Sequence, residues 1–144
     1  QAMSAGTNIT HSEMNADNNE PVKFLQIWVI PNKAGVTPRY QQLRMDENMP
    51  HNTFNQVLSS NADDAGVWIH QNAWFHMGRF DKGVTETYEL KDANNGVYVL
   101  VLEGQVTING STLDTRDGLG IWNTKSFTVD ANAEARVLLM EVPM

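Results

Sequence analysis

Residues 97–110 read VYVLVLEGQVTING, and this stretch decides the expected fold class. Its first six residues are apolar or aromatic and alternate β-branched types with other large side chains, which predicts a strand that is buried on both faces. The following run, residues 105–108, leads into Asn109-Gly110, the dipeptide most typical of a two-residue hairpin turn. The stretch therefore predicts antiparallel β-structure with a central strand over residues 97–102.

Short runs with a period of two continue in both directions from this stretch. The expected strands cover residues 24–30, 66–70, 73–80, 85–90, 112–115, 119–122, 127–129 and 135–142. Short strands at close spacing, separated by Gly, Asn-Gly and Asp-Gly turns, are typical of an all-β sandwich or barrel. Only residues 53–60 are also compatible with a helical turn, because Phe54, Val57 and Leu58 would share one side of it.

Composition and charge exclude several classes of partner. The chain has 144 residues, with 17 acidic and 10 basic side chains and a net charge of −7. Nucleic acids are bound mainly by Lys and Arg on phosphates, so we expect no direct nucleic-acid binding. No apolar run approaches the roughly 20 residues that span a bilayer, and no signal peptide is visible, so we expect no membrane partner. There is no cysteine, which fits a reducing cytoplasm and leaves no disulfide or thiolate chemistry.

His11 and Glu13 are the strongest candidate metal ligands from residue types alone. On a strand, residues i and i+2 point to the same face, so the two side chains would bind one ion together. An imidazole and a carboxylate form part of a ligand set for non-haem iron or a similar divalent metal. Taken alone, the pair is better explained as a solvated polar strand edge, because such pairs are common on strands by chance.

The remaining histidines add no complete site. His51 follows Pro50 in an expected loop, and His70 and His76 lie on expected strands, where we interpret them as ordinary half-buried residues. No His-x-His pair occurs, and no serine lies in a nucleophile-elbow pattern. The tryptophans fit either a cavity for a flat ligand or core packing, and their spacing does not choose between these; they are Trp28, Trp68, Trp74 and Trp122.

Several motifs together resemble one family over the whole chain. They are MSAGTNITHSE at 3–13, LQIWVIP at 25–31, GVTPRYQQ at 35–42, GQVTING at 104–110, DGLGIW at 117–122 and VLLMEVP at 137–143. In these motifs the chain resembles the C-terminal half of pirin-family bicupins, and within that family the bacterial pirin-like quercetin 2,3-dioxygenases.

The resemblance implies a fold and a division into domains. The expected fold is an all-β, cupin-type antiparallel β-barrel, also called a jelly roll or double-stranded β-helix. Residues 53–144 would form the C-terminal pirin-type cupin. Residues 1–31 would be the terminal strands left over from a truncated N-terminal cupin, and residues 32–52 would link the two.

The resemblance also implies the chemistry of the site. His11 and Glu13 match the later metal-binding pair of the family's first cupin, where the divalent metal is usually iron, and Glu13 would accept the hydroxyl proton of a flavonol. The family's His-x-His pair has no counterpart here, so we expect this chain alone to bind no iron tightly and to be inactive. In the second cupin the corresponding positions fall at Leu90, Asp92 and Gly96, which predicts a metal-free domain.

The expected partners follow from the same resemblance. They are the missing N-terminal cupin half or another copy of the chain, with a flavonol-like small molecule in the intact parent. Two alternatives to an enzyme are a regulatory interaction module, as in pirin-type transcription cofactors, and a structural cupin lid. Because residues 24–30 are apolar on nearly both faces, we expect residues 1–31 to pair with another copy rather than to pack back on the barrel, with residues 41–52 as the connector.

Overall fold

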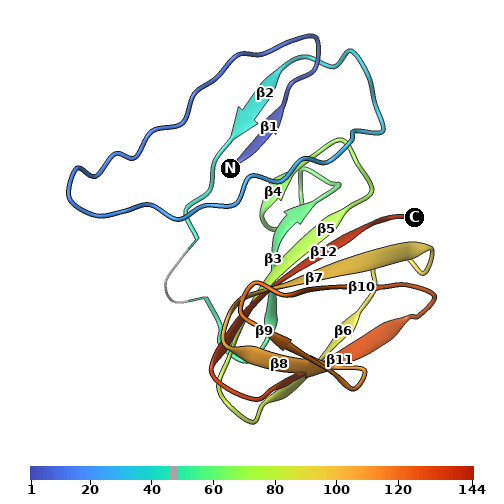
Figure 1. Ribbon diagram of the computed structural model, residues 1–144. Helices are drawn as coiled ribbons and strands as arrows, with labels where there is room; N and C mark the ends of the chain where they lie inside the picture. The colour runs from blue at the N-terminus through green and yellow to red at the C-terminus, as the bar shows by residue number, and fades with distance from the viewer. Residues whose placement is uncertain (46–48) are drawn as a thin grey trace.

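The computed structural model describes residues 1–45 and 49–144 and consists of β-strands and irregular connections (Figure 1). A two-stranded ribbon near the N-terminus pairs β1 (Ala2–Ser4) with β2 (Arg39–Gln41). None of the described residues forms a helix that is long and apolar enough to cross a membrane.

Two larger sheets form the body of the protein. The first sheet contains, in spatial order, β10 (Gly118–Ile121), β7 (Asn95–Glu103), β12 (Ala135–Pro143), β5 (Trp74–Phe80), β3 (Phe54–Ser59) and β4 (Val67–Trp68). The second contains β6 (Thr85–Glu89), β11 (Ser126–Ala131), β8 (Gln105–Ile108) and β9 (Ser111–Asp114). All neighbouring strands are antiparallel except β3 and β4.

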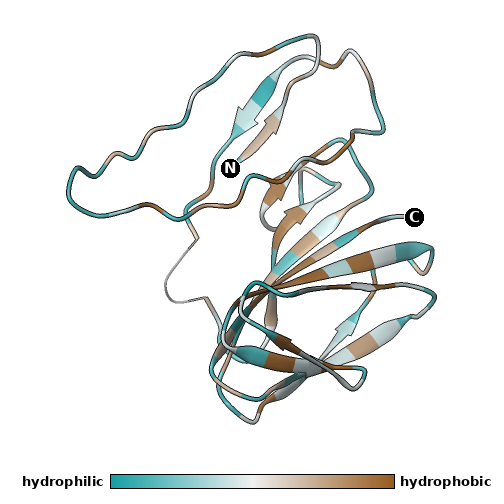
Figure 2. Ribbon diagram, viewed as in Figure 1, coloured by the Kyte–Doolittle hydropathy of each residue, from teal (hydrophilic) through white to brown (hydrophobic). Residues whose placement is uncertain are grey.

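The main hydrophobic core lies between these two sheets. Along β12, Val137 and Leu139 belong to this core, whereas Leu138 and Met140 belong to a second cluster. Successive residues of a strand point to opposite faces, so the second cluster covers the outer face of the six-stranded sheet. Figure 2 shows the apolar residues along the strands of both sheets.

The N-terminal segment contributes to the second cluster. Ala2 is a buried member of this cluster, as are sandwich residues such as Phe75 and Leu138. The partly buried Val29 packs against the cluster. The strong apolar character of β7 and β12 on both faces is explained by this arrangement, because each face buries against a different cluster.

The expected fold class is confirmed. The central position of residues 97–102 is correct, since β7 lies between β10 and β12. The hairpin at Asn109-Gly110 is also correct, because β8 pairs with β9 and both turn residues have positive φ, 50° and 79°. The hydrogen-bond ladder divides into two facing sheets, so the cupin fold is present as a β-sandwich and not as a closed barrel.

The structure decides one open alternative and contradicts one expectation. Residues 53–60 do not form a helical turn; most of them form β3, because the edge of β5 supplies an antiparallel partner. Residues 24–30 are irregular and not a strand, because no neighbouring segment of the described chain supplies ladder hydrogen bonds to them. The proposed domain limits at residues 31 and 53 stay predictions, and residues 46–48 of the expected linker lie outside the described residues.

Candidate functional site

His11 and Glu13 lie in the irregular connection between β1 and β2, and both are exposed. They are therefore not on a strand, and the expectation that they share a strand face was wrong for this structure. The reason is the same as for residues 24–30: among the described residues, no segment pairs with this connection as a strand. Their proposed role as metal ligands stays a prediction.

The start of this connection is held against its end. The backbone N–H of Thr7 donates to the carbonyl oxygen of Val36 at 3.1 Å. Gly6 has a positive φ of 53°, and a Cβ at this position would lie 2.0 Å from the Val36 oxygen. Only glycine allows this close approach, which explains the residue at this point of the motif. The chain that leads to His11 thus begins from a fixed backbone contact.

The donor types of His11 and Glu13 suit a divalent cation, but their number does not complete a site. The described part of the chain contains no group of three or more His, Cys, Asp or Glu side chains that could hold a metal ion. A metal with two protein ligands keeps most of its water shell and is held weakly. The residues present therefore do not fit a complete metal centre by themselves.

A polar contact joins β2 to the edge of the sandwich. The guanidinium of Arg39 lies 3.7 Å from the ring centroid of Trp68 and donates through Nη2 to the Trp68 carbonyl oxygen. Gln41 Oε1 accepts both from Arg39 Nη1 at 3.0 Å and from the Trp68 backbone N–H at 3.2 Å. We call this arrangement of Arg39, Gln41 and Trp68 the clasp.

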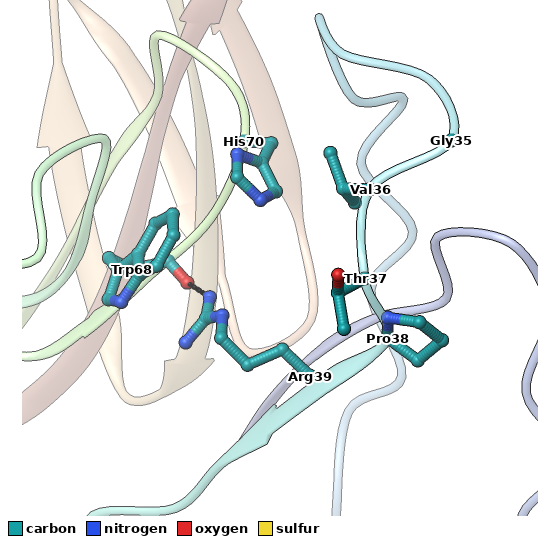
Figure 3. A pocket seen from close by; sticks show the side chains of 7 residues that line it. All are labelled: Gly35, Val36, Thr37, Pro38, Arg39, Trp68 and His70. Atoms are coloured by element: carbon teal, nitrogen blue, oxygen red, sulfur yellow. Dashed lines mark hydrogen bonds between the residues drawn. The ribbon is translucent and has the colours of Figure 1, made fainter.

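An open cleft of about 510 Å³ lies beside the clasp. Residues 35–39 form one wall, and Trp68 and His70 form the other (Figure 3). The His70 ring meets the Trp68 ring edge-on, with centroids 4.9 Å apart. His70 is half-buried, as expected, but it lies two residues beyond the end of β4 and not on a strand.

The most deeply buried charged group lies elsewhere, between the two sheets. The carboxylate of Glu141 has no exposed surface. Its Oε1 accepts from the Asp92 backbone N–H and from Asn95 Nδ2, and its Oε2 accepts from the Lys91 backbone N–H and the Tyr88 hydroxyl, at 2.8–2.9 Å. Four donors replace the lost water, so the carboxylate fastens the turn between β6 and β7 to β12.

His76 extends this buried group. The single proton of the Tyr88 hydroxyl is donated to Glu141, so the hydroxyl accepts from Nδ1–H of His76 at 3.2 Å. Burial of the ring, and then the positive charge of Lys91, lower the pKa of His76 to about 4 against the opposing effect of Glu141. Burial, and then the hydrogen bond to Glu141, raise the pKa of Tyr88 above its ordinary value. The imidazole is neutral at pH 7.

This buried network was not found from the sequence. His76 was interpreted as an ordinary half-buried strand residue, but it is buried and hydrogen-bonded. The available signal was Glu141 within the apolar run of residues 137–142, since a charge there requires internal partners. The network is closed inside the sandwich and holds a turn, so it is a structural element and not a binding site.

Comparison with known proteins places the chain in a family. The family model described as the quercetinase C-terminal cupin domain matches residues 56–142. The chain belongs to the pirin family. Quercetin 2,3-dioxygenase of Escherichia coli K12 is 36% identical over 143 residues, which are 99% of this pirin-family chain and 60% of that protein. A putative quercetin 2,3-dioxygenase of Mycobacterium tuberculosis H37Rv is 32% identical over 145 residues, 99% of this chain and 58% of that protein.

Solved pirin structures have the same fold. The crystal structure of YhhW from Escherichia coli matches with a TM-score of 0.73 and 32% identity, covering 81% of this chain and 48% of that chain. The complex of the bacterial pirin YhhW with nickel(II) matches with a TM-score of 0.72 and 31% identity, over the same shares. The pirin-family chain thus spans about 60% of the length of the first E. coli relative. The nickel(II) complex shows that a divalent metal occurs in this family. Metal binding by this chain, and the identity of the metal, stay predictions.

Proposed function

We propose that this chain acts as the C-terminal cupin part of a metal-dependent dioxygenase of the quercetin 2,3-dioxygenase type. The observation that carries the proposal is the match of 99% of the chain, at 36% identity, to the E. coli protein of that name. The nickel(II) complex of a related pirin supports a divalent metal in the working protein. Iron is our first choice of metal, and a flavonol is the expected substrate class.

His11 and Glu13 supply two ligands in this proposal, and a preceding cupin supplies the others. Their exposure supports this, because both side chains are accessible to ligands brought by another domain. When bound, the metal would supply Lewis-acid and redox chemistry. Glu13 would also accept a hydroxyl proton from the substrate on its carboxylate oxygen. Because two ligands do not complete a centre, we expect the chain alone to be inactive.

The test is a fusion of residues 1–144 behind the part of the E. coli quercetin 2,3-dioxygenase that precedes the matched region. We expect this fusion to bind iron stoichiometrically and to consume quercetin, and the chain alone to do neither. His11→Ala and Glu13→Gln should each remove most of the bound metal, as measured by elemental analysis.

Matched substitutions control for general damage. His51→Ala and Glu20→Gln change exposed residues of the same types outside the site and should leave metal content and turnover within about two-fold of the parent fusion. A fusion that keeps its iron after His11→Ala would contradict the ligand assignment. A fusion that binds iron but leaves quercetin unchanged would instead favour the regulatory interaction module.

A further inference from the structure

We infer that the clasp is the positioning device by which the C-terminal sandwich sets the place of the segment that carries the candidate ligands. The inference rests on the proposed role of His11 and Glu13, and it gives the C-terminal sandwich a task in the same site. It assigns Arg39, Gln41 and Trp68 as positioning residues, which act through backbone and not by contact with a metal.

The clasp has the properties of a specific attachment. The planar guanidinium of Arg39 stacks on one aromatic face while two of its N–H groups are aimed at Gln41 and at the Trp68 carbonyl. Arginine, unlike lysine, provides both the flat face and the fixed fork of donors. Arg39 makes no salt bridge with any described carboxylate, so these contacts are what hold its partly buried charge.

Strand pairing carries this attachment toward the ligand segment. The register of the ribbon places Ser4 opposite Arg39 and Ala2 opposite Gln41. Each clasp residue of β2 is therefore paired directly with a residue of β1. Immediately after β1, the Thr7–Val36 hydrogen bond holds the chain again, and His11 follows in the same connection.

The far end of the connection is attached to the same edge of the sandwich. The backbone N–H of Asn32 donates to the His70 carbonyl oxygen at 2.7 Å, and Gln71 Nε2 donates to the Ile30 carbonyl oxygen at 2.8 Å. These acceptor and donor groups directly follow β4, the strand that carries Trp68. The segment that contains the candidate ligands is thus attached to one edge of the sandwich at both of its ends. Residues 30–32 are attached directly, and β1 is attached through its pairing with β2, which carries Arg39 and Gln41 of the clasp.

Hydrogen exchange of the chain itself tests the attachment without any metal. Arg39→Gln should speed amide exchange at residues 2–8 at least ten-fold, because the ribbon then opens independently of the sandwich. Exchange in β7 and β12 should be unchanged, which also verifies that the variant is folded. Arg39→Lys should behave like Arg39→Gln, since it keeps the charge but lacks the planar fork. Arg116→Gln, at an exposed turn position, should leave exchange at residues 2–8 unchanged.

Two exchange results would overturn the inference. One is an unchanged rate at residues 2–8 in Arg39→Gln. The other is full recovery by Arg39→Lys, since charge alone would then suffice.

Nickel titration of the fusion separates this inference from the proposed function. With both candidate ligands intact, Arg39→Gln should weaken Ni²⁺ binding several-fold, while Arg116→Gln should not. If His11→Ala abolishes binding and Arg39→Gln leaves it unchanged, the positioning inference is wrong and the ligand assignment stands. If His11→Ala leaves binding unchanged, the ligand assignment and the positioning of that pair are both wrong, whatever the exchange rates show about the ribbon.

Discussion

Single residues decide how this sandwich tolerates a buried charge. Glu141 is fully buried and is stabilised only because four donors converge on its two oxygens. The same network keeps His76 neutral. Its Nδ1–H donates to Tyr88, and burial of the ring disfavours the protonated, charged form. A buried histidine held neutral makes folding sensitive to mild acid.

The stability of the chain should fall between about pH 6.5 and pH 4 because of His76. In the folded protein the pKa of His76 is about 4, below the ordinary 6.5 that it regains on unfolding. In this window the unfolded state binds a proton that the folded state does not, so the contribution is present above pH 6.5 and is lost as the pH falls toward 4. The loss amounts to about 3 kcal/mol at most, at about 1.4 kcal/mol per pH unit.

Urea unfolding at pH 7, 6 and 5 measures this effect. His76→Gln should flatten the pH dependence, even if it lowers stability at pH 7. His51→Gln changes an exposed histidine and should leave the slope as in the parent chain. A slope that persists in His76→Gln would assign the acid sensitivity to other groups.

At the scale of elements, the period-two pattern predicted the strands of the sandwich well, because each strand has a buried face. β5, β7, β11 and β12 all lie within a few residues of their expected positions. The pattern failed where a segment is apolar but has no neighbouring strand to pair with. Residues 24–30 are as apolar as a strand but have no ladder partner in the described part of the chain. The sequence of β3 was ambiguous because its strand conformation depends on pairing with β5 and β4, which lie outside it.

The bend between β7 and β8 gives an element-scale prediction. Gly104 and Gly110 have nearly equal positive φ, 81° and 79°. A Cβ at Gly104 would lie 2.0 Å from the Glu134 carbonyl oxygen, whereas a Cβ at Gly110 would meet nothing within 4 Å. Gly110→Ala should therefore cost only the left-handed strain, about 1–2 kcal/mol. Gly104→Ala should cost about 1–3 kcal/mol more, because the backbone must shift.

Thermal and urea unfolding of both variants check this comparison. Since φ is nearly the same at the two positions, the difference between the variants reports mainly on the close approach to Glu134. Equal losses of stability would show that the contact relaxes without cost.

At the scale of the whole molecule, the sequence predicted candidate ligands but not the clasp residues that we infer to position them. His11 and Glu13 were found because a short motif carries them. The clasp could not be found, because Arg39 and Trp68 are 29 residues apart and share no pattern. In the proposed function the remaining ligands come from a preceding cupin, and no local sequence pattern predicts contacts between domains.

The isolated chain should associate through residues 22–30. Val29 packs on the sandwich, so this segment is partly held back on it, but Trp28 and Ile30 beside it are 89% and 85% exposed. A run of exposed large apolar side chains on unpaired extended backbone is an association surface, and for the chain alone the available partner is a second copy.

Sedimentation velocity should show a mass that rises with concentration. Replacing Trp28 and Ile30 by Ser should reduce this rise, whereas Met14→Ser, equally exposed at 89%, should not. A parent chain that stays monomeric at every concentration would contradict the prediction.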